Sequence, residues 1–176
     1  MAKKEVILVS ACLLGIKCRY DGKSKPNKKV LKLAKEKILI PVCPEILGGL
    51  PTPREPAEQK GKRVITKSGK DVTKYFKKGA KEVLKIAKIL GVKKAILKQK
   101  SPSCGCGKIF DGTFSDKIIK GDGVTTKLLK KHKIKVISEE DLWKRSKISN
   151  DREEFHKELI LGNYPKLKGQ LNLELA

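Results

Sequence analysis

Three cysteines follow predicted β-strands, and their thiols could together hold a metal centre. Cys12 comes after the run EVILVS, Cys43 after ILIPV, and Cys104 after AILKQKSPS. The carboxyl ends of parallel strands share one edge of an open α/β sheet, and ligands bind at that edge. We therefore expect the three thiols to converge. Three thiolates without an obvious fourth ligand predict a metal centre with one open position, as catalytic centres have.

The residue types leave zinc and an iron–sulfur cluster open as the metal. Only His132 and His156 are histidines, and neither lies near a cysteine-bearing segment. Their scarcity weakens a mixed cysteine–histidine zinc site. Thiolate-only ligation is compatible with an iron–sulfur cluster, although the spacing is not a compact ferredoxin run. Cys18 and Cys106 are the remaining thiols; Cys106 could be a spare ligand, and either could be a partly buried thiol without chemistry.

Glu45 and Ser101 are the candidates for acid–base chemistry. Glu45 follows Cys43 by two residues, and a carboxylate near a metal and a dry pocket can be tuned to transfer protons. Otherwise it accepts backbone hydrogen bonds at the start of a helix. Ser101 could orient a water or a substrate oxygen, or its hydroxyl could cap the turn before Pro102.

Positive charge and a glycine-rich loop point to an anionic ligand. The loop GGLPTPR contributes Gly48, Gly49, Thr52 and Arg54, whose backbone N–H groups, hydroxyl and guanidinium suit a phosphate. A rigid turn is the alternative. The net charge of +23 comes mostly from lysines spread along the chain. They form either a solvated coat or a field that attracts an anionic substrate or a nucleic acid.

Strand and helix patterns alternate along the first part of the chain. This alternation predicts an α/β fold in three layers, with a mostly parallel sheet and right-handed crossovers. Turn-rich loops are expected over 44–69 and 100–122. The expected strands are 5–10, 38–42, 94–99 and 134–138. The expected helices are 28–37, a long one that Asp71 or Thr73 caps and that ends at about Leu90, and 123–132.

Length and composition predict one cytoplasmic domain. With 176 residues the chain can form its own core, and it has no apolar run of membrane-spanning length. We interpret the short apolar start as a buried strand and not a signal peptide, which predicts reduced thiols. Residues 1–140 are expected to form the main domain. Residues 141–176 should add a charged helical extension packed on it, with helices over 139–147 and 150–161, and a homodimer is compatible with the sequence.

Several motifs, in this order, resemble the thiouracil desulfidase family over about residues 5–140. They are SACLLG, CRYDG, CPEILGGLPTPREPAE, DVT, AILKQKSPSCG and GDGVTTKLL. The resemblance implies a Rossmann-like domain in which Cys12, Cys43 and Cys104 hold a 4Fe–4S cluster. Its fourth iron would stay free to bind the sulfur of a thiolated pyrimidine, with Glu45 and Ser101 beside it. Cys18 lies in the CRYDG motif without being one of the implied ligands.

The implied activity is a hydrolytic, non-redox desulfuration. Its substrate would be thiouracil or a thiolated uracil nucleotide such as 4-thiouridine monophosphate (4-thio-UMP), and it would release hydrogen sulfide. We expect the substrate to contact Gly48, Gly49, Thr52 and Arg54, together with Arg19 and Ser103. Two alternatives remain open: an enzyme that thiolates or dethiolates tRNA, and a non-catalytic metal-bearing interaction module.

Overall fold

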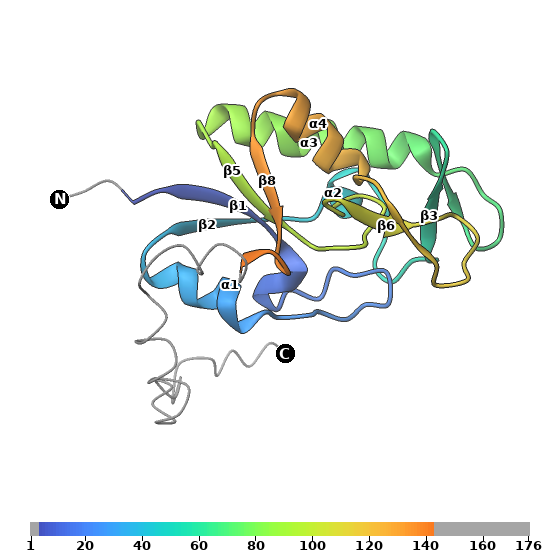
Figure 1. Ribbon diagram of the computed structural model, residues 1–176, viewed down its shortest axis with the longest axis horizontal. Coiled ribbons are helices and arrows are strands. Elements are labelled where there is room, and N and C mark those ends of the chain that lie inside the picture. The colour runs from blue at the N-terminus through green and yellow to red at the C-terminus, as the bar shows by residue number, and fades with distance from the viewer. Residues whose placement is uncertain (1–3, 143–176) are drawn as a thin grey trace. The chain divides into compact units, whose positions relative to one another are not determined.

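Four parallel strands form the central sheet of the computed structural model, which describes residues 4–142 (Figure 1). The strand order is β2-β1-β5-β8, and each neighbouring pair is parallel. The predicted α/β class with a mostly parallel sheet is confirmed. The strands are β1 (Val6–Ser10), β2 (Ile38–Val42), β5 (Lys94–Leu97) and β8 (Lys135–Ser138).

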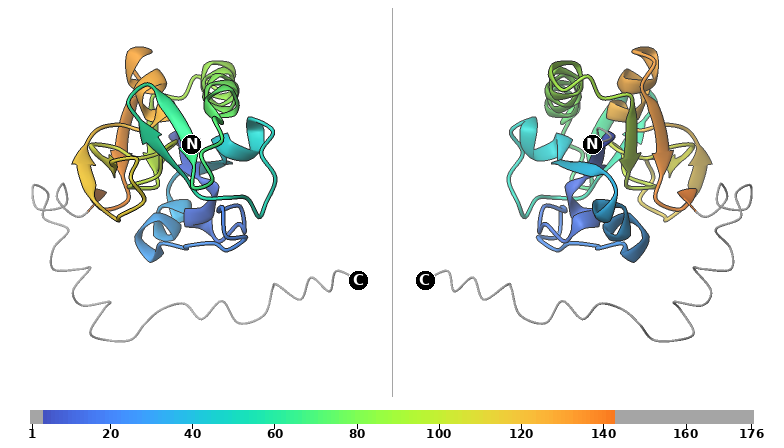
Figure 2. Two further views of the ribbon diagram at one scale, coloured as in Figure 1. Left: turned by 90° about the vertical axis from the view of Figure 1, so that its right-hand side faces the viewer. Right: turned by 90° about the vertical axis from the view of Figure 1, so that its left-hand side faces the viewer.

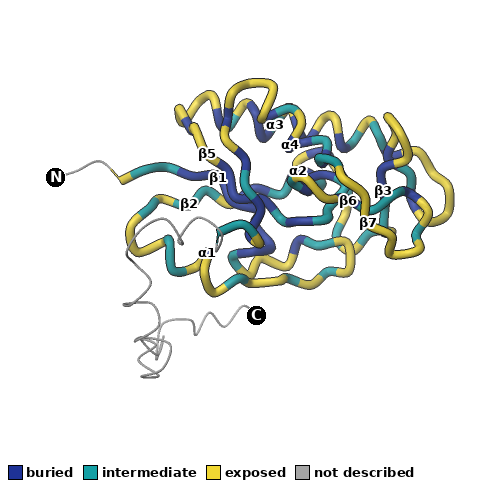
Figure 3. Tube along the Cα trace, viewed as in Figure 1, coloured by how far each residue is buried: buried dark blue, intermediate teal, exposed yellow. Residues whose placement is uncertain are grey.

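Helices cover both faces of this sheet and make three layers. Helices α3 (Thr73–Ile89) and α4 (Val124–Lys131) lie on one face, and α1 (Lys28–Lys32) lies on the other (Figures 1 and 2). Burying each large aliphatic side chain contributes about 1.5–3 kcal/mol. Buried residues follow the central strands (Figure 3). The core between the sheet and the α3–α4 layer contains fully buried Leu8, Val83, Ala95, Leu97 and Leu129.

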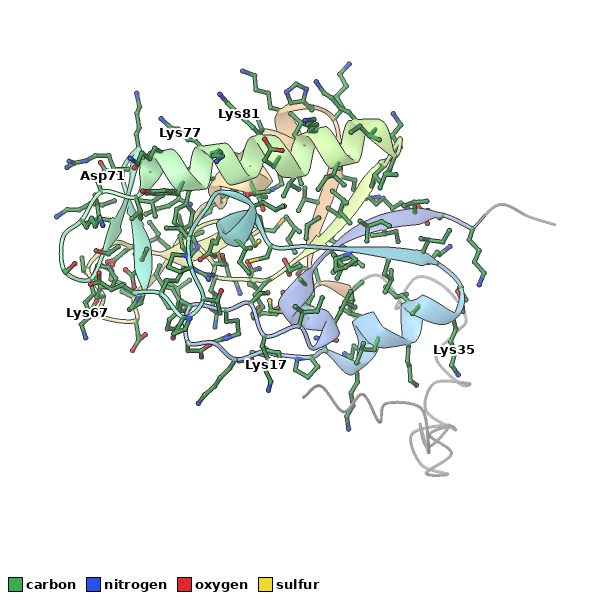
Figure 4. The ribbon with its side chains drawn as sticks, turned by 180° about the vertical axis from the view of Figure 1, so that it is seen from behind. Lys17, Lys35, Lys67, Asp71, Lys77 and Lys81 are labelled. Carbon is green, nitrogen blue, oxygen red and sulfur yellow. The ribbon has the colours of Figure 1, made fainter. Side chains whose placement is uncertain are left out.

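Helix α3 buries one face in the core and exposes lysines on the other. Its buried residues recur at helical spacing, from Phe76 through Val83 to Ala87. Lys77 and Lys81 point away from the sheet into solvent (Figure 4). The helix ends before Gly91, which has a φ of +63° and thus the left-handed conformation that favours glycine.

The predicted cap of α3 is wrong, because Val72 occupies the N-cap position. Asp71 instead accepts a hydrogen bond from the Thr73 N–H at 2.9 Å and forms a turn. The Thr73 hydroxyl accepts from the Val64 N–H at 2.8 Å. The second of these bonds ties the start of α3 to a neighbouring strand, and neither caps the helix.

Two segments predicted as loops contain regular structure. Residues 44–69 hold α2 (Pro44–Leu47) and the antiparallel pair β3 (Ala57–Lys60) and β4 (Arg63–Thr66). Residues 100–122 hold the pair β6 (Lys108–Phe110) and β7 (Ile118–Lys120). These strands have only three or four residues each, too few to show the alternating pattern that identifies a strand in a sequence.

Smaller corrections apply to the first half of the chain. The helix predicted over 28–37 is α1 followed by a 3-10 turn, η2 (Leu33–Lys35), and a second 3-10 turn, η1 (Ala11–Leu14), follows β1.

Within residues 4–142, no helix is both long and apolar enough to cross a membrane. The predicted extension lies outside the described residues from residue 143 onward.

Two glycines let α2 lie directly against α3. A Cβ at Gly79 would come within 1.7 Å of the Pro44 carbonyl oxygen, and one at Gly48 within 2.1 Å of the Tyr75 carbonyl oxygen. No side chain fits between backbones at such distances. The position of α2, which carries Glu45, therefore depends on this contact with α3.

Replacing Gly79 should loosen that contact and destabilise the fold. We expect Gly79→Ala to lower the free energy of unfolding by about 1–3 kcal/mol, since an inserted methyl group overpacks the interface. This loss should appear although alanine has the better helix propensity. Denaturant unfolding measures it, with the exposed neighbour Lys78→Ala as control. Equal stability of Gly79→Ala and the wild type would contradict the close packing.

Candidate active site

Three cysteine-bearing turns leave the same edge of the sheet. Cys12 lies in η1 directly after β1, Cys43 joins β2 to α2, and Cys104 lies in the turn after β5. Because β2, β1 and β5 are neighbours and parallel, their carboxyl ends lie side by side. The thiol of Cys104 is close enough to Cys43 and Glu45 to interact with both electrostatically. Cys12 and Cys104 are 7% and 5% exposed, so the site is largely shielded from water.

A fourth thiol joins this group, which we call the thiol cluster: Cys12, Cys18, Cys43 and Cys104. Cys18 is buried, and its thiol forms hydrogen bonds with the thiols of Cys12 and Cys43. The Cys43 thiol also donates to the Cys18 carbonyl oxygen at 3.6 Å. The sequence pointed to no role for Cys18, because only the path of the loop after Gly15 brings it here.

Cys106 is directed elsewhere. Its thiol donates to the carbonyl oxygen of Val136 on β8 at 3.5 Å, and it interacts with Lys130 of α4. The Cys104-x-Cys106 spacing therefore places the two thiols in different surroundings.

The donor chemistry of the thiol cluster fits an iron–sulfur cluster. All its donors are thiols, the ligands that such clusters take. The hydrogen bond with Cys12 raises the pKa of Cys18 to about 11, and burial raises the pKa of Cys104 to about 12. Within residues 4–142, no three cysteine, histidine or acidic side chains lie close enough to share a single metal ion. In a four-iron cluster each thiolate binds a different iron, so its ligands need not lie that close.

Glu45 is fixed by a buried ion pair with Arg54. The guanidinium Nε and Nη2 both approach Glu45 Oε2, at 2.7 and 2.6 Å, and the side chains are 6% (Arg54) and 17% (Glu45) exposed. Oε1 has no hydrogen-bond partner among the described residues. Since Arg54 occupies one oxygen, Oε1 is the oxygen that can accept a proton from a water or a substrate.

Arg54 uses all five of its N–H donors. Besides Glu45, its Nη1 donates to the Pro51 carbonyl oxygen at 3.2 Å and to the Thr52 hydroxyl at 3.1 Å. Its Nη2 donates to the Cys18 carbonyl oxygen at 3.1 Å. One guanidinium thus ties together the Cys18 loop, the start of α2 and the loop after it, which leaves no N–H for a phosphate.

Other predicted substrate contacts are also engaged within the fold. Gly48 packs against α3, and Ser103 is fully buried and hydrogen-bonded to Thr125 at 2.9 Å. Arg19 pairs with Asp21 at 3.0 Å and keeps 24% of its side chain exposed. Arg19 and the exposed Gly49 are therefore the most accessible of the predicted contacts.

Ser101 holds the turn that carries Cys104. Its hydroxyl oxygen accepts hydrogen bonds from the N–H groups of Ser103 and Cys104, each at 3.1 Å. This is the capping role that the sequence allowed as an alternative. A serine hydroxyl has two acceptor sites and one donor. With both acceptor sites used, its O–H remains the group that can donate to a ligand.

Replacing Arg54 should show how much the Arg54–Glu45 ion pair contributes to the stability of the fold. Arg54→Gln leaves a partly buried carboxylate without its partner, which typically costs about 3–5 kcal/mol for a buried pair. We expect a loss of this order in the free energy of unfolding. The double variant Arg54→Gln/Glu45→Gln should recover much of it, because the carboxylate is gone as well.

The matched control is Arg19→Gln. The pair of Arg19 with Asp21 lies nearer the surface, so its loss should cost less than about 1 kcal/mol. Similar losses in Arg19→Gln and Arg54→Gln would show that the Arg54–Glu45 pair has no special structural role.

Comparisons with known proteins agree with this geometry. YbbK, an uncharacterised protein of Bacillus subtilis (strain 168), is 48% identical over 147 residues, which cover 78% of this chain and 97% of YbbK. The solved structure of TudS, a [4Fe-4S]-dependent thiouracil desulfidase, superposes with a TM-score of 0.76 at 48% identity. That match covers 80% of this chain and 95% of TudS.

A family model described as 2-thiouracil desulfurase matches residues 7–141, the segment that contains the complete thiol cluster, Glu45 and Arg54. The resemblance seen in the motifs is thereby confirmed. The chain belongs to the 2-thiouracil desulfurase family, a family of enzymes that remove sulfur from thiouracil.

Proposed function

We propose that this enzyme is a 4Fe–4S-dependent desulfidase that hydrolyses the thiocarbonyl group of thiouracil or of a thiolated uracil nucleotide such as 4-thio-UMP. The observation that carries the proposal is the thiol cluster at one edge of the sheet, with the Glu45 carboxylate beside it. Water supplies the oxygen, so the thiocarbonyl group and water become a carbonyl group and hydrogen sulfide. The reaction needs no electron donor or acceptor.

Cys12, Cys43 and Cys104 are the proposed ligands. Each lies at the carboxyl end of a different strand of the parallel sheet, and the related TudS is [4Fe-4S]-dependent. A cluster bound by these three thiolates would supply a Lewis-acidic iron for the thiocarbonyl sulfur. In this scheme Cys18 stays a hydrogen-bonding neighbour of two ligands.

Glu45 and Ser101 would handle the proton and the attacking oxygen. Glu45 Oε1 is placed to accept a proton from water, while Arg54 holds the carboxylate in one orientation through Oε2. A positioned general base contributes about 10²–10⁴-fold in rate. The Ser101 hydroxyl can donate a hydrogen bond to the attacking water oxygen and orient it, since two backbone N–H groups occupy its acceptor sites.

The strong positive charge supports a phosphorylated substrate. The chain carries a net charge of +23, and lysines on α3 project into solvent (Figure 4). A field of this sign attracts anions over several ångströms. Arg19 and Gly49 are the predicted anion contacts that the fold leaves accessible. A homodimer and a nucleic-acid partner remain predictions from the sequence.

Serine substitutions test the ligand assignment. Cys12→Ser, Cys43→Ser and Cys104→Ser should each abolish the broad absorbance near ~400 nm expected of a thiolate-bound cluster. Cys18→Ser and Cys106→Ser should retain it. Anaerobic reconstitution, followed by iron and sulfide counts, measures the effect. Loss of the cluster in Cys18→Ser with retention in Cys12→Ser would exchange their assignments.

Glu45→Gln tests whether Glu45 transfers a proton in the reaction and is not needed to bind the iron–sulfur cluster. The variant should retain the cluster absorbance and lose about 10²–10⁴-fold in kcat, because glutamine cannot take the proton. Steady-state release of sulfide measures the rate, and Glu36→Gln, an exposed glutamate outside the site, is the control. Unchanged turnover in Glu45→Gln would remove this carboxylate from the mechanism.

The salt dependence of kcat/KM tests whether the enzyme recognises the phosphate of a nucleotide substrate. At low ionic strength 4-thio-UMP should have a higher kcat/KM than the free base 4-thiouracil, and added salt should reduce the difference by screening exposed charges. Equal kcat/KM for the two compounds at low salt would mean that the lysines are only a solvated coat.

A further inference from the structure

A cavity of about 160 Å³ lies beside the Arg54–Glu45 pair. Its walls come from the loop after α2, from the β3–β4 hairpin and from the start of α3. Leu50, Ala57, Phe76 and Lys70 line it together with Glu45 and Arg54. No cysteine is among the described residues that line it. Glu45 thus faces the cavity while interacting with Cys43 and Cys104 of the thiol cluster.

The walls are suited to one flat ring. Phe76 is 1% exposed and belongs, with Val64 and Val72, to a second hydrophobic cluster that Leu50 and Ala57 extend. An apolar cavity of about 150 Å³ holds a molecule the size of benzene. The cavity beside Glu45 therefore has room for a single six-membered ring, and its apolar walls favour a ring over a sugar or a phosphate.

We propose that this cavity binds the pyrimidine ring of the substrate, with the thiocarbonyl edge toward Glu45. The inference rests on the proposed desulfidase function and adds the residues that select the ring. In this position the carbon that loses sulfur lies next to the proposed base. Phe76 and Leu50 supply apolar contacts to the ring, and Ala57 keeps its space free.

Lys70 is placed to bind the anionic tail of a nucleotide. Three lining residues are exposed, Pro51, Glu55 and Lys70, so the cavity opens to solvent beside them. The Glu55 carboxylate accepts hydrogen bonds from the Ser68 N–H and hydroxyl and is also attracted electrostatically to Lys70. Lys70 is then the cationic side chain at the opening, in a position that a phosphate on the ring's substituent can reach.

Filling the cavity tests the ring assignment. Ala57→Leu, and independently Leu50→Phe on a different wall, should raise KM for 4-thiouracil and 4-thio-UMP by roughly tenfold or more, by excluding the ring. Both should retain the cluster absorbance, and Ala34→Leu, which enlarges an exposed alanine outside the cavity, is the size-matched control. Binding of UMP, measured by calorimetry on the cluster-loaded enzyme, should weaken to a similar extent.

Lysine substitutions test the opening of the cavity. Lys70→Gln should raise KM for 4-thio-UMP by about 2- to 5-fold, as expected for an exposed ion pair, and leave KM for 4-thiouracil unchanged. Lys67 is an exposed lysine (Figure 4) that is not among the residues lining the cavity, and Lys67→Gln should change neither value. A larger effect of Arg19→Gln than of Lys70→Gln on 4-thio-UMP would overturn the Lys70 assignment.

Two results distinguish failure of this inference from failure of the proposed function. Unchanged KM and unchanged UMP binding in folded Ala57→Leu and Leu50→Phe would overturn the ring site while leaving the desulfidase intact. Absence of turnover in the cluster-loaded wild type would instead overturn the proposed function. Even then, UMP binding that Ala57→Leu abolishes would support a pyrimidine site in the cavity.

Discussion

Hydrogen bonding between neighbouring parallel strands is the constraint on which this site depends. The registers of β1 with β2 and with β5 fix where each strand ends, so the turns that begin with Ala11, Cys43 and Lys98 leave the sheet together. Ser10 reinforces this: its hydroxyl accepts from the Lys98 N–H at 2.9 Å and also contacts the Cys104 thiol. Thiols far apart in sequence therefore meet without any local motif.

Arg54 adds the second constraint, at the level of side chains. Buried ion pairs often contribute little net stability, because desolvation opposes the attraction between the charges. The Arg54–Glu45 pair instead fixes positions, because one guanidinium links three segments that the sheet alone does not align. The Glu45 carboxylate that Arg54 holds interacts with the thiols of Cys43 and Cys104 and also lines the apolar cavity. Arg54 is thus a positioning residue in this account.

The sequence correctly predicted the strands and the helix that have a regular apolar pattern. The apolar runs before Cys12, Cys43 and Cys104 identified the strands, and the spacing from Phe76 to Ala87 identified α3. It missed the hairpins β3–β4 and β6–β7, whose strands of three or four residues are too short to show such a pattern. It also assigned Arg54 to a phosphate, whereas the fold uses each of its donors internally. The place of Cys18 and the cavity at Phe76 depend on tertiary packing, so no local spacing could have indicated them.

Isotope transfer from water distinguishes hydrolysis of the thiocarbonyl group from a redox desulfuration. An anaerobic turnover of 4-thio-UMP in ¹⁸O-labelled water should yield UMP with one labelled oxygen where the sulfur stood, together with one sulfide per product. No electron donor or acceptor should be needed, because water replaces sulfur at an unchanged oxidation state. Unlabelled UMP, or a turnover that requires a reductant, would contradict hydrolysis at the carbon beside Glu45.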